Sequence, residues 1–454
     1  MFWEPRNLDF KIFCDSSNAY FSCSELDQKI ESFPKLKQRQ LIVAFTARNI
    51  HFLSFYLWAL RNNHVLILSD SNIDTSFQNE LIQKYKPNLI WQNSVLESIH
   101  ETPLKLHKSL ALTLSTSGST GDSKQIRLSY NNIQENASSI AQYLDIDSTE
   151  TAITNLPLHY SYGLSILNSH LEIGANIILS EKSIVDRNFW KLFKEKSCTS
   201  LAGVPYIYET LKKLRFERME LPALRYLTQA GGKLDDEYIE YISDYSQNKN
   251  IRFFVMYGQT EATARISYLP PLSLEKNIGS IGRAIPGGEL FLKNTDVFEK
   301  VNNFSVGELC YKGPNVMMGY ANSKLDLSMG EEQNSELETG DLGYCDDQGL
   351  FFIVGRIKRF IKLFGIKVGL DDLEAKLKIS SKANILITGN DDHIMVALDK
   401  KDENKKDIIK EILIKSFGFY HKAIEIQLFD EFPRLSSNKY NYENIKQCFQ
   451  SRNF

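Results

Sequence analysis

Helix-forming and strand-forming segments alternate along most of residues 1–355, and this alternation limits the folds open to the chain. The stretch HFLSFYLWALRNN at 51–63 predicts an apolar helix, and HVLILSD at 64–70 predicts a buried strand that ends in polar residues. Further strands are predicted in LALTLSTSG at 110–118 and GANIILSE at 174–181. We therefore expect an α/β fold of layered helices and largely parallel sheets.

The character of the chain changes near residue 355. The stretch RIKRFIKLFGIK at 356–367 carries basic residues and no acid. Beyond it, short helices and strands of their own are predicted in the segments 370–378, 383–389, 393–399, 405–417 and 423–429. We therefore expect a large N-terminal domain at 1–355, built of layered sheets and helices, and a small α+β C-terminal domain at 356–454.

Composition and charge exclude several classes of function. Hydrophobic residues make up 43% of the chain and the net charge is −3, so neither disorder nor binding to nucleic acid is expected. The most apolar early stretch, 52–60, is too short to cross a bilayer, so no transmembrane segment is expected. The cysteines are scattered without a CxxC pair, which favours a reducing cytoplasm over a disulfide framework or a zinc site.

A run of small and hydroxyl residues follows the predicted strand at 110–114. It reads Ser115-Thr116-Ser117-Gly118-Ser119-Thr120-Gly121-Asp122-Ser123-Lys124. Small residues let backbone N–H groups turn inward, hydroxyls add donors and the lysine adds a positive charge, which together suit a polyphosphate. The spacing is not that of a Walker A loop. By itself, such a run is more often a flexible polar turn than a binding site.

Further motifs follow this loop in a fixed order. They are Leu156-Pro157-Leu158-His159-Tyr160-Ser161-Tyr162-Gly163, Gly203-Val204-Pro205, Ala230-Gly231-Gly232-Lys233-Leu234, Met256-Tyr257-Gly258-Gln259-Thr260-Glu261, Glu338-Thr339-Gly340-Asp341-Leu342-Gly343, Gly355-Arg356-Ile357-Lys358 and Pro433-Arg434-Leu435-Ser436-Ser437-Asn438-Lys439. Single residues among them have ordinary structural explanations, such as a turn for Asp341 or core packing for Tyr160. The ordered set over 115–439 does not arise by chance.

The set resembles the motifs of the adenylate-forming superfamily, which comprises acyl-CoA synthetases, nonribosomal adenylation domains and firefly luciferase. The resemblance implies that ATP is bound by a phosphate loop, by strand-end loops, and by Asp341 and Arg356 near the ribose. The residues implied are Thr116, Ser117, Gly118, Ser119, Thr120, Gly121, Lys124, Gly231, Gly232, Tyr257, Gly258, Gln259, Thr260, Asp341 and Arg356. Tyr257 packs near adenine in this interpretation, and the carboxylate of Asp341 accepts both ribose hydroxyls.

The same resemblance implies catalytic, metal and acyl-pocket residues. Glu261 is expected to hold Mg²⁺, since a hard cation that bridges phosphates prefers carboxylate oxygen. The catalytic set also includes Thr260 at the α-phosphate, Lys124 at the outer phosphates, and Lys439, which steers the substrate carboxylate. The acyl pocket is expected to be lined by His159, Tyr160, Ser161, Tyr162 and Ala230. Lys358 is the expected hinge about which the small, mobile C-terminal domain rotates.

Two positions depart from the motifs of the family. Ser123 stands where proline usually precedes the loop lysine, and Asn438 stands where the C-terminal motif usually has glycine. Asparagine adopts the left-handed conformation more readily than most residues, so the second change is mild. The histidines form no HExxH pair, and neither a GxSxG nor a GxGxxG motif that follows a strand occurs. A hydrolase or dehydrogenase activity therefore has little support from the sequence.

The implied reaction uses ATP and Mg²⁺ to convert a small carboxylic acid into its acyl-AMP. The acyl group then passes to a thiol, either of coenzyme A or of phosphopantetheine on an acyl carrier protein. Amino-acid adenylation domains carry an aspartate where this chain has Ser161, which favours an acid without an α-ammonium group. Two alternatives stay open: an amino-acid ligase that loads a carrier protein, and a nucleotide-binding homologue without catalysis.

Overall fold

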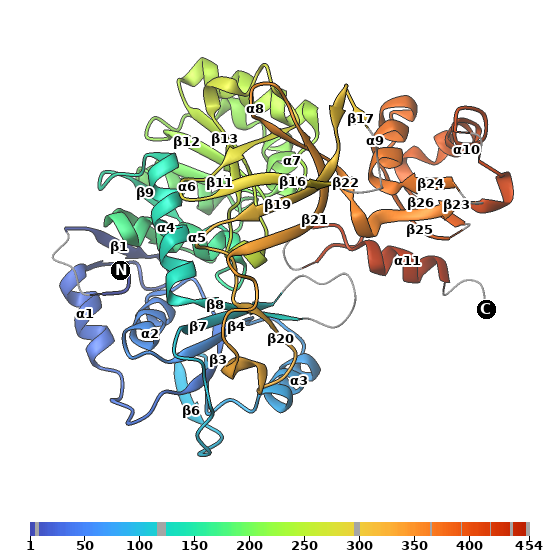
Figure 1. The fold of residues 1–454 in the computed structure, drawn as a ribbon. Helices are drawn as coiled ribbons and strands as arrows, with labels where there is room; N and C mark the ends of the chain where they lie inside the picture. Colours follow the sequence, from blue (N-terminus) through green and yellow to red (C-terminus); the bar gives the residue numbers. More distant parts are fainter. Residues whose placement is uncertain are drawn as a thin grey trace. The chain divides into compact units, whose positions relative to one another are not determined.

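The structure is a computed structural model of the 454-residue chain. It describes residues 1–4, 9–115, 124–294, 300–363, 366–391, 393–417, 419–435 and 439–450. Two compact units are present (Figure 1). The first consists of Met1–Gly118, Ser123–Leu290 and Tyr311–Leu337, and the second takes in Phe291–Cys310 and Glu338–Phe454. The predicted boundary at 355–356 lies inside the second unit and stays a prediction.

One sheet of the first unit is built around four parallel strands. Its order is β20-β8-β7-β4-β3-β5-β6, in which β3, β4, β5 and β7 are parallel and the other three are antiparallel to their neighbours. The bounds are Leu41–Thr46 for β3, Val65–Asp70 for β4, Leu89–Gln92 for β5, Val95–Ser98 for β6, Leu110–Ser115 for β7, Gln125–Ser129 for β8 and Gly319–Ala321 for β20. The predicted strands at 64–70 and 110–114 are thus confirmed.

The second sheet of this unit is also largely parallel. Its strands run in the order β15-β14-β13-β12-β11-β9-β10-β1-β2. The strands from β13 to β1 in this order are parallel, and β15, β14 and β2 are antiparallel to their neighbours. The bounds are Lys11–Cys14 (β1), Ala19–Ser22 (β2), Thr151–Ile153 (β9), Asn176–Leu179 (β10), Ser200–Gly203 (β11), Tyr226–Gln229 (β12), Arg252–Tyr257 (β13), Ser267–Leu269 (β14) and Ser280–Ala284 (β15).

Helices of the first unit cover these sheets, and one of them is buried on nearly every side. The helices are α1 (Cys23–Glu31), α2 (Ile50–Arg61), α3 (Thr75–Tyr85), α4 (Tyr130–Leu144), α5 (Ser161–Ile173), α6 (Arg187–Glu195), α7 (Pro205–Lys213) and α8 (Asp236–Lys249). The side chains of 52–60 on α2 are all buried, as its apolar sequence predicts. None of the helices in the described parts of the chain is both long and apolar enough to span a membrane.

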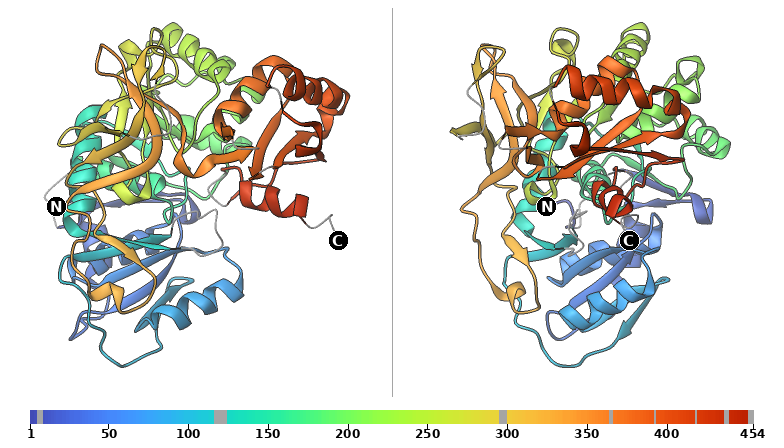
Figure 2. Two further views of the ribbon diagram at one scale, coloured as in Figure 1. Left: turned by 45° about the vertical axis from the view of Figure 1, so that its right-hand side comes forward. Right: turned by 90° about the vertical axis from the view of Figure 1, so that its right-hand side faces the viewer.

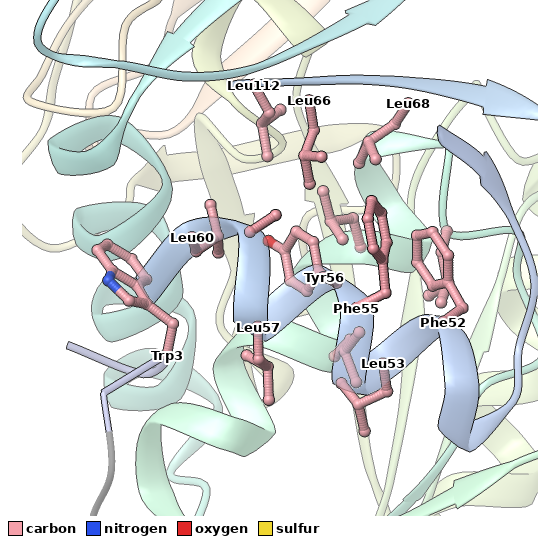
Figure 3. Packing of buried hydrophobic residues seen from close by; sticks show 14 of the residues in the cluster. Trp3, Phe52, Leu53, Phe55, Tyr56, Leu57, Leu60, Leu66, Leu68 and Leu112 are labelled. Carbon is pink, nitrogen blue, oxygen red and sulfur yellow. The ribbon is translucent and has the colours of Figure 1, made fainter. Parts of the chain in front are cut away.

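Helix α2 packs on two sides at once. Figure 3 shows Phe52 and Phe55 beside Leu66 and Leu68 of β4, while Leu53 and Leu57 point the opposite way. The ring of Phe55 also stacks on Trp91 of β5, with centroids 4.2 Å apart. A helix with apolar residues around its whole circumference is stable only in such a buried position. This packing joins the sheet of β3 and β4 to the helices that carry the candidate site.

The second unit contains a sheet segment and a small α+β layer. The strands β16 (Glu289–Asn294), β19 (Gly307–Lys312), β21 (Glu336–Cys345) and β22 (Phe351–Arg356) neighbour one another in this order. Two short strand pairs accompany them, β17 (Lys300–Val301) with β18 (Phe304–Ser305) and β23 (Phe360–Leu363) with β24 (Ile366–Gly369). The antiparallel ladder of β21 and β22 matters most for function, since it pairs Asp341 with Arg356.

The last part of the second unit is a three-stranded sheet with helices on both faces (Figure 2). Its strands are β25 (Ile385–Asn390), β26 (His393–Asp399) and β27 (Ile424–Phe429), and its helices are α9 (Leu370–Ser381), α10 (Lys406–Lys415) and α11 (Tyr442–Gln450). Alternate residues of β25 face opposite sides: Ile385 and Ile387 pack with α9 and α10, and Leu386 packs with α11. The predicted elements of this region are confirmed.

We expect the change Phe55→Ala to destabilise the protein strongly. The side chain is 0% exposed, and its removal leaves a cavity between α2 and Trp91. Loss of a buried phenylalanine typically costs about 3–5 kcal/mol of unfolding free energy. Denaturant unfolding followed by circular dichroism measures the effect. The matched control is Phe77→Ala on α3, where the side chain is 55% exposed, and equal losses in both variants would contradict the assigned packing.

Candidate active site

The ends of parallel strands bring three of the predicted motifs to one edge of a sheet. Strands β9, β11, β12 and β13 run in the same direction, so the segments that follow them lie at the same edge. Ligands of open α/β sheets bind at this edge, because the loops there converge from several strands. The segments concerned are His159–Tyr162 after β9, Ala230–Gly232 after β12, and Gly258–Glu261 after β13.

Tyr160 and Gly231 meet at this edge. Gly231 has φ of +88°, and a Cβ atom placed on it would lie 2.5 Å from the hydroxyl oxygen of Tyr160. Both the backbone conformation and the close approach therefore require glycine here. Burial raises the pKa of Tyr160 to about 12, so the phenol remains protonated at neutral pH. Tyr160, a predicted residue of the acyl pocket, thus lies directly against the predicted nucleotide loop.

Ser161 and Thr260 also come together. Their hydroxyl oxygens are 3.3 Å apart, within hydrogen-bond distance. Ser161 is the first residue of α5, and Thr260 lies in a short 3₁₀ turn directly after β13. The position at which we expected the acyl pocket therefore adjoins the threonine that we expected at the α-phosphate.

Glu261 is linked to Lys124 through Tyr320, a residue that the sequence motifs do not include. The hydroxyl of Tyr320 donates to Oε1 of Glu261 at 3.1 Å. The Nζ atom of Lys124 lies 5.3 Å from the centre of the Tyr320 ring. Burial and the charge of Glu261 both raise the pKa of Tyr320, so it stays a donor. The link exists because β20 pairs with β8, which begins directly after Lys124.

A strained turn follows Glu261. Thr263 has φ of +64° and ψ of −56°, and the amide of Ala264 donates to the carbonyl of Ala262 at 2.6 Å. This is a γ-turn with positive φ, a rare and strained conformation for a β-branched residue. The hydroxyl of Thr263 donates to the carbonyl oxygen of Asn315 at 2.7 Å. The surrounding structure must therefore hold the turn in place.

The buried side chain of Asn315 supplies that support. Its amide nitrogen donates to the carbonyl oxygens of Ala262 and Arg265, both at 2.8 Å. Its oxygen accepts from the hydroxyl of Tyr311 at 2.7 Å. Sequence reasoning missed Asn315, and the only local signal is its position after Gly313-Pro314, a pair typical of turns.

Two of the predicted pocket residues point away from this meeting of loops. The ring of His159 contacts Thr46 Oγ1 with Nδ1 at 3.2 Å, and its Nε2 lies 3.7 Å from Asp70 Oδ2, so it faces the ends of β3 and β4. Burial lowers the pKa of His159, and Asp70 opposes this shift. The buried hydroxyl of Tyr162 donates to the carbonyl of Thr228 at 2.8 Å.

The remaining predicted residues of the first unit have these positions. Lys124 is exposed and Ala230 is buried. The side chain of Gln259 donates to the hydroxyl of Tyr257 at 3.1 Å, and the carbonyl of Gly232 accepts from Gln229 at 2.8 Å. Gly258 must be glycine, since a Cβ atom there would lie 1.9 Å from the carbonyl oxygen of Ala264. The phosphate-loop residues Thr116, Ser117, Gly118, Ser119, Thr120 and Gly121 lie outside the described residues.

In the second unit, Asp341 and Arg356 form an ion pair. Nε of Arg356 lies 2.7 Å from Oδ1 of Asp341, on neighbouring strands. The carboxylate is buried, with 2% of its side chain exposed, whereas 58% of the arginine side chain is exposed. On the same strand as Asp341, the hydroxyl of Thr339 donates to the carbonyl of Leu309 at 2.6 Å. Arg356 is thus the more accessible partner for a ligand.

Lys439 and Lys358 lie in irregular parts of the second unit. The backbone of Lys439 accepts from the amide of Leu435 at 2.8 Å, and Arg434 pairs with Tyr440 in an antiparallel bridge. The backbone of Lys439 is therefore held beside that of Leu435. Lys358 is in the 3₁₀ turn Ile357–Arg359, directly after β22, and its side chain is outside the described set. The hinge remains a prediction.

Comparison with known proteins places this site in a family. The family model for AMP-binding enzymes matches residues 62–321, more than half of the chain. The chain belongs to the AMP-binding enzyme family. A luciferin 4-monooxygenase of Nipponoluciola cruciata is 29% identical over 272 residues, which make up 59% of this chain and 49% of that enzyme. The chain thus aligns with about half the length of this relative.

Two further similar proteins agree with this assignment. An indoleacetate–CoA ligase of Aromatoleum aromaticum is 24% identical over 349 residues, 75% of this chain and 67% of the ligase. The solved structure of o-succinylbenzoate CoA synthetase from Bacillus subtilis, in complex with its acyl-adenylate intermediate, has a TM-score of 0.78 at 20% identity. That likeness covers 97% of this chain and 95% of the synthetase. The predicted α/β fold and the predicted superfamily are confirmed.

We expect Tyr320→Phe to weaken the response of this AMP-binding enzyme to Mg²⁺. The variant keeps the ring beside Lys124 but removes the hydroxyl that donates to Glu261. Such a hydrogen bond to a charged group is worth about 1.5–3 kcal/mol, although partial exposure of Tyr320 reduces the effect. The Mg²⁺ concentration that gives half-maximal pyrophosphate exchange should rise several-fold. An unchanged Mg²⁺ response would show that Tyr320 does not act on Glu261.

We expect Asn315→Ala to impair both stability and adenylation. The carbonyls of Ala262 and Arg265 lose their donor, and leaving a buried polar group unpaired costs about 1–3 kcal/mol. Relaxation of the strained turn should also displace Glu261, so the turnover rate should fall. Thermal unfolding and pyrophosphate exchange measure the two effects. The exposed residue Asn322 provides the control Asn322→Ala, which should change neither.

Proposed function

We propose that this protein uses ATP to convert a carboxylic acid into its acyl-AMP and then transfers the acyl group to a thiol. The proposal rests on one arrangement of side chains at the ends of the strands. In it Thr260 lies beside Ser161, and Tyr320 contacts both Glu261 and Lys124. A hydroxyl, a carboxylate and an ammonium group are the donors and charges that a triphosphate requires. Membership of the AMP-binding family supports the same reaction.

The first half-reaction is an attack on phosphorus. An oxygen of the substrate carboxylate forms a bond to the α-phosphorus of ATP, and the bond to the β-phosphate oxygen breaks, so pyrophosphate leaves. Catalysis of such a transfer depends on positioning and on stabilising negative charge. We assign Thr260 to the α-phosphate, Lys124 to the outer phosphates and Lys439 to the substrate carboxylate. The assignment of Lys439 rests on its motif alone.

The nucleotide would be held by residues of several loops. We assign the phosphates to Thr116, Ser117, Gly118, Ser119, Thr120 and Gly121, the adenine to Gly231, Gly232, Tyr257, Gly258 and Gln259, and the ribose to Asp341 and Arg356. Glycine at 231 and 258 lets these loops pack directly against Tyr160 and the carbonyl of Ala264, which keeps both loops at the edge of the sheet. The ion pair with Arg356 orients the buried carboxylate of Asp341.

Glu261 suits Mg²⁺ bound to ATP. Magnesium in nucleotide sites is held by one or two carboxylates together with substrate phosphates. A single glutamate oriented by Tyr320 meets that need. The described residues contain no cluster of three acidic, histidine or cysteine ligands that would hold a metal without the nucleotide. When bound, the ion supplies charge neutralisation at the phosphates.

The substrate that we propose is a small acid without an α-ammonium group. Ser161 is buried and contacts Thr260, the residue that we assign to the α-phosphate, and this contact supports placing the substrate carboxylate near Ser161. A buried ammonium group without a carboxylate partner is strongly disfavoured, and a serine hydroxyl does not replace that partner. In the second half-reaction, a thiol sulfur attacks the acyl carbonyl, the bond to AMP breaks, and the thiol proton is lost. Coenzyme A and carrier-protein phosphopantetheine both offer such a thiol. We propose that the reaction takes place in the cytoplasm.

The proposal is tested by pyrophosphate exchange across a panel of acids. We expect acid-dependent exchange of labelled pyrophosphate into ATP, with an acid preferred over its α-amino analogue by about a hundredfold in kcat/KM. A preference for the α-amino compound would establish an amino-acid ligase. Tight ATP binding without exchange for any acid would establish a binding protein without catalysis.

We expect Lys439→Ala to separate the two half-reactions. If this lysine steers the substrate carboxylate, its loss should lower acyl-AMP formation by about a hundredfold or more. Transfer from chemically prepared acyl-AMP to a thiol should stay nearly unchanged. Pyrophosphate exchange and a thioester-formation assay measure the two steps. Lys415, whose side chain is exposed, provides the control variant Lys415→Ala. Equal losses in both half-reactions of Lys439→Ala would contradict the assigned role.

A further inference from the structure

A buried arginine lies in the wall of a small cavity behind the candidate active site. Arg265 is 3% exposed and follows the strained turn at Thr263. The cavity measures about 20 Å³, and its lining includes Tyr162, Thr228 and Met256 as well as Arg265. All of these belong to the first unit. None of the sequence motifs includes Arg265.

The guanidinium of Arg265 has no anionic partner among the described residues. It lies over the ring of Tyr162 at 4.0 Å from the centroid, and its Nη1 donates to the carbonyl of Ala264 at 3.1 Å. Its Nε is buried and makes no hydrogen bond within the described chain. The side chain also makes a hydrogen bond to the hydroxyl of Tyr143. These neutral partners offset only part of the cost of burying this charge. The site therefore has an unused donor and an unbalanced positive charge.

The other polar groups of the cavity are neutral. Nδ1 of His170 lies 2.8 Å from the carbonyl of Ile166, and its Nε2 lies 3.2 Å from the hydroxyl of Tyr226. Burial lowers the pKa of His170 to about 4, so the ring is uncharged at neutral pH. Burial raises the pKa of Tyr143, which therefore keeps its proton. The cavity thus presents one positive charge, surrounded by neutral hydroxyls.

The cavity adjoins the reacting groups. Tyr162, which carries the guanidinium on its ring, directly follows Ser161, and Ser161 contacts Thr260. Met256 directly precedes Tyr257 at the end of β13. The ring of Tyr162 is also 6.3 Å from the ring of Tyr160, so the guanidinium of Arg265 lies behind the two tyrosines that we expect to line the acyl pocket.

We propose that Arg265 binds a second anionic group on the acid substrate, which makes a dicarboxylic acid the substrate class of this enzyme. The proposal rests on the adenylation reaction proposed above. A carboxylate matches the guanidinium because its two oxygens accept from two N–H groups of the planar fork. The single negative charge of a carboxylate also balances the single positive charge of Arg265, whereas the two negative charges of a phosphate dianion would leave one unbalanced. The cavity is water-sized, so a carboxylate enters it only if side chains of the lining move, and hydroxyls of the lining then complete its hydrogen bonds.

Matched acids test the proposal on the unmodified protein. A series of straight-chain dicarboxylic acids is compared in pyrophosphate exchange with the monoamide and the monocarboxylic acid of the same chain length. The best dicarboxylic acid should exceed its own monoamide by about tenfold to a hundredfold in kcat/KM, as expected for a charge-assisted pair. Equal or better exchange with the uncharged analogues overturns the proposal and leaves the adenylation reaction intact.

The variant Arg265→Met tests the residue itself. Methionine keeps the unbranched apolar stem and removes the charge. We expect KM for the dicarboxylic acid to rise about tenfold or more, while kcat/KM for the monocarboxylic acid stays level or improves. The melting temperature without substrate should be unchanged or higher, because an unpaired buried charge is removed. A loss that is equal for both acids, or a lower melting temperature with unchanged acid preference, would mean a structural role and overturn the proposal.

A second arginine offers the matched control. Arg283 also lies over a tyrosine ring, that of Tyr268 at 5.6 Å, but it is exposed. The variant Arg283→Met should keep the preference for the dicarboxylic acid. If no acid supports exchange, the proposed function fails, and thermal shift with the dicarboxylic acid alone then decides the inference. Stabilisation of the unmodified protein but not of Arg265→Met supports the anion site, and absence of stabilisation overturns it. If Arg265→Met does not fold, the matched acids remain decisive.

Discussion

The clamp that Asn315 places on the turn after β13 is the interaction on which the candidate site depends. That turn contains a threonine at positive φ, a conformation that would relax without support. One side-chain amide donates to carbonyls on both sides of the turn. The clamp therefore fixes Glu261 on one side of the turn and Arg265 on the other. Loss of this support would displace the proposed metal-binding residue and the proposed anion site together.

The charges of the first unit are arranged around neutral hydroxyls. Tyr320 lies between Glu261 and Lys124, so the carboxylate and the ammonium are held without forming a direct ion pair in the described contacts. Both charges are thereby left available for the phosphates and the metal of the proposed reaction. Asp341 in the second unit differs, because its carboxylate is already paired with Arg356. This difference suits the proposed roles: phosphate binding requires unneutralised charge, whereas ribose binding requires an oriented acceptor.

The local pattern of apolar and polar residues was sufficient to predict the helices and strands in which that pattern is most regular. Helix α2 is apolar around its whole circumference, and only a buried helix accommodates such a sequence. The strands β4 and β7 are short β-branched and apolar runs bounded by polar residues, which is the pattern of a buried parallel strand. The motif residues at the ends of β12 and β13 were also predictable, because parallel strands deliver their following loops to one edge. The contact between Tyr160 and Gly231 could not be predicted in this way, because it depends on the path of the chain between β9 and α5.

The sequence by itself determined the α/β class, the family and the chemical groups that a triphosphate requires, because these depend on local periodicity and on motifs of adjacent residues. Only the tertiary structure decided which distant residues complete the site. Tyr320 reaches Glu261 because β20 pairs with β8, and Asn315 reaches the turn through a segment far along the chain. The lack of an acid beside Arg265 is likewise a property of packing in the described chain, since a lone arginine in a sequence carries no sign of burial or of its partners.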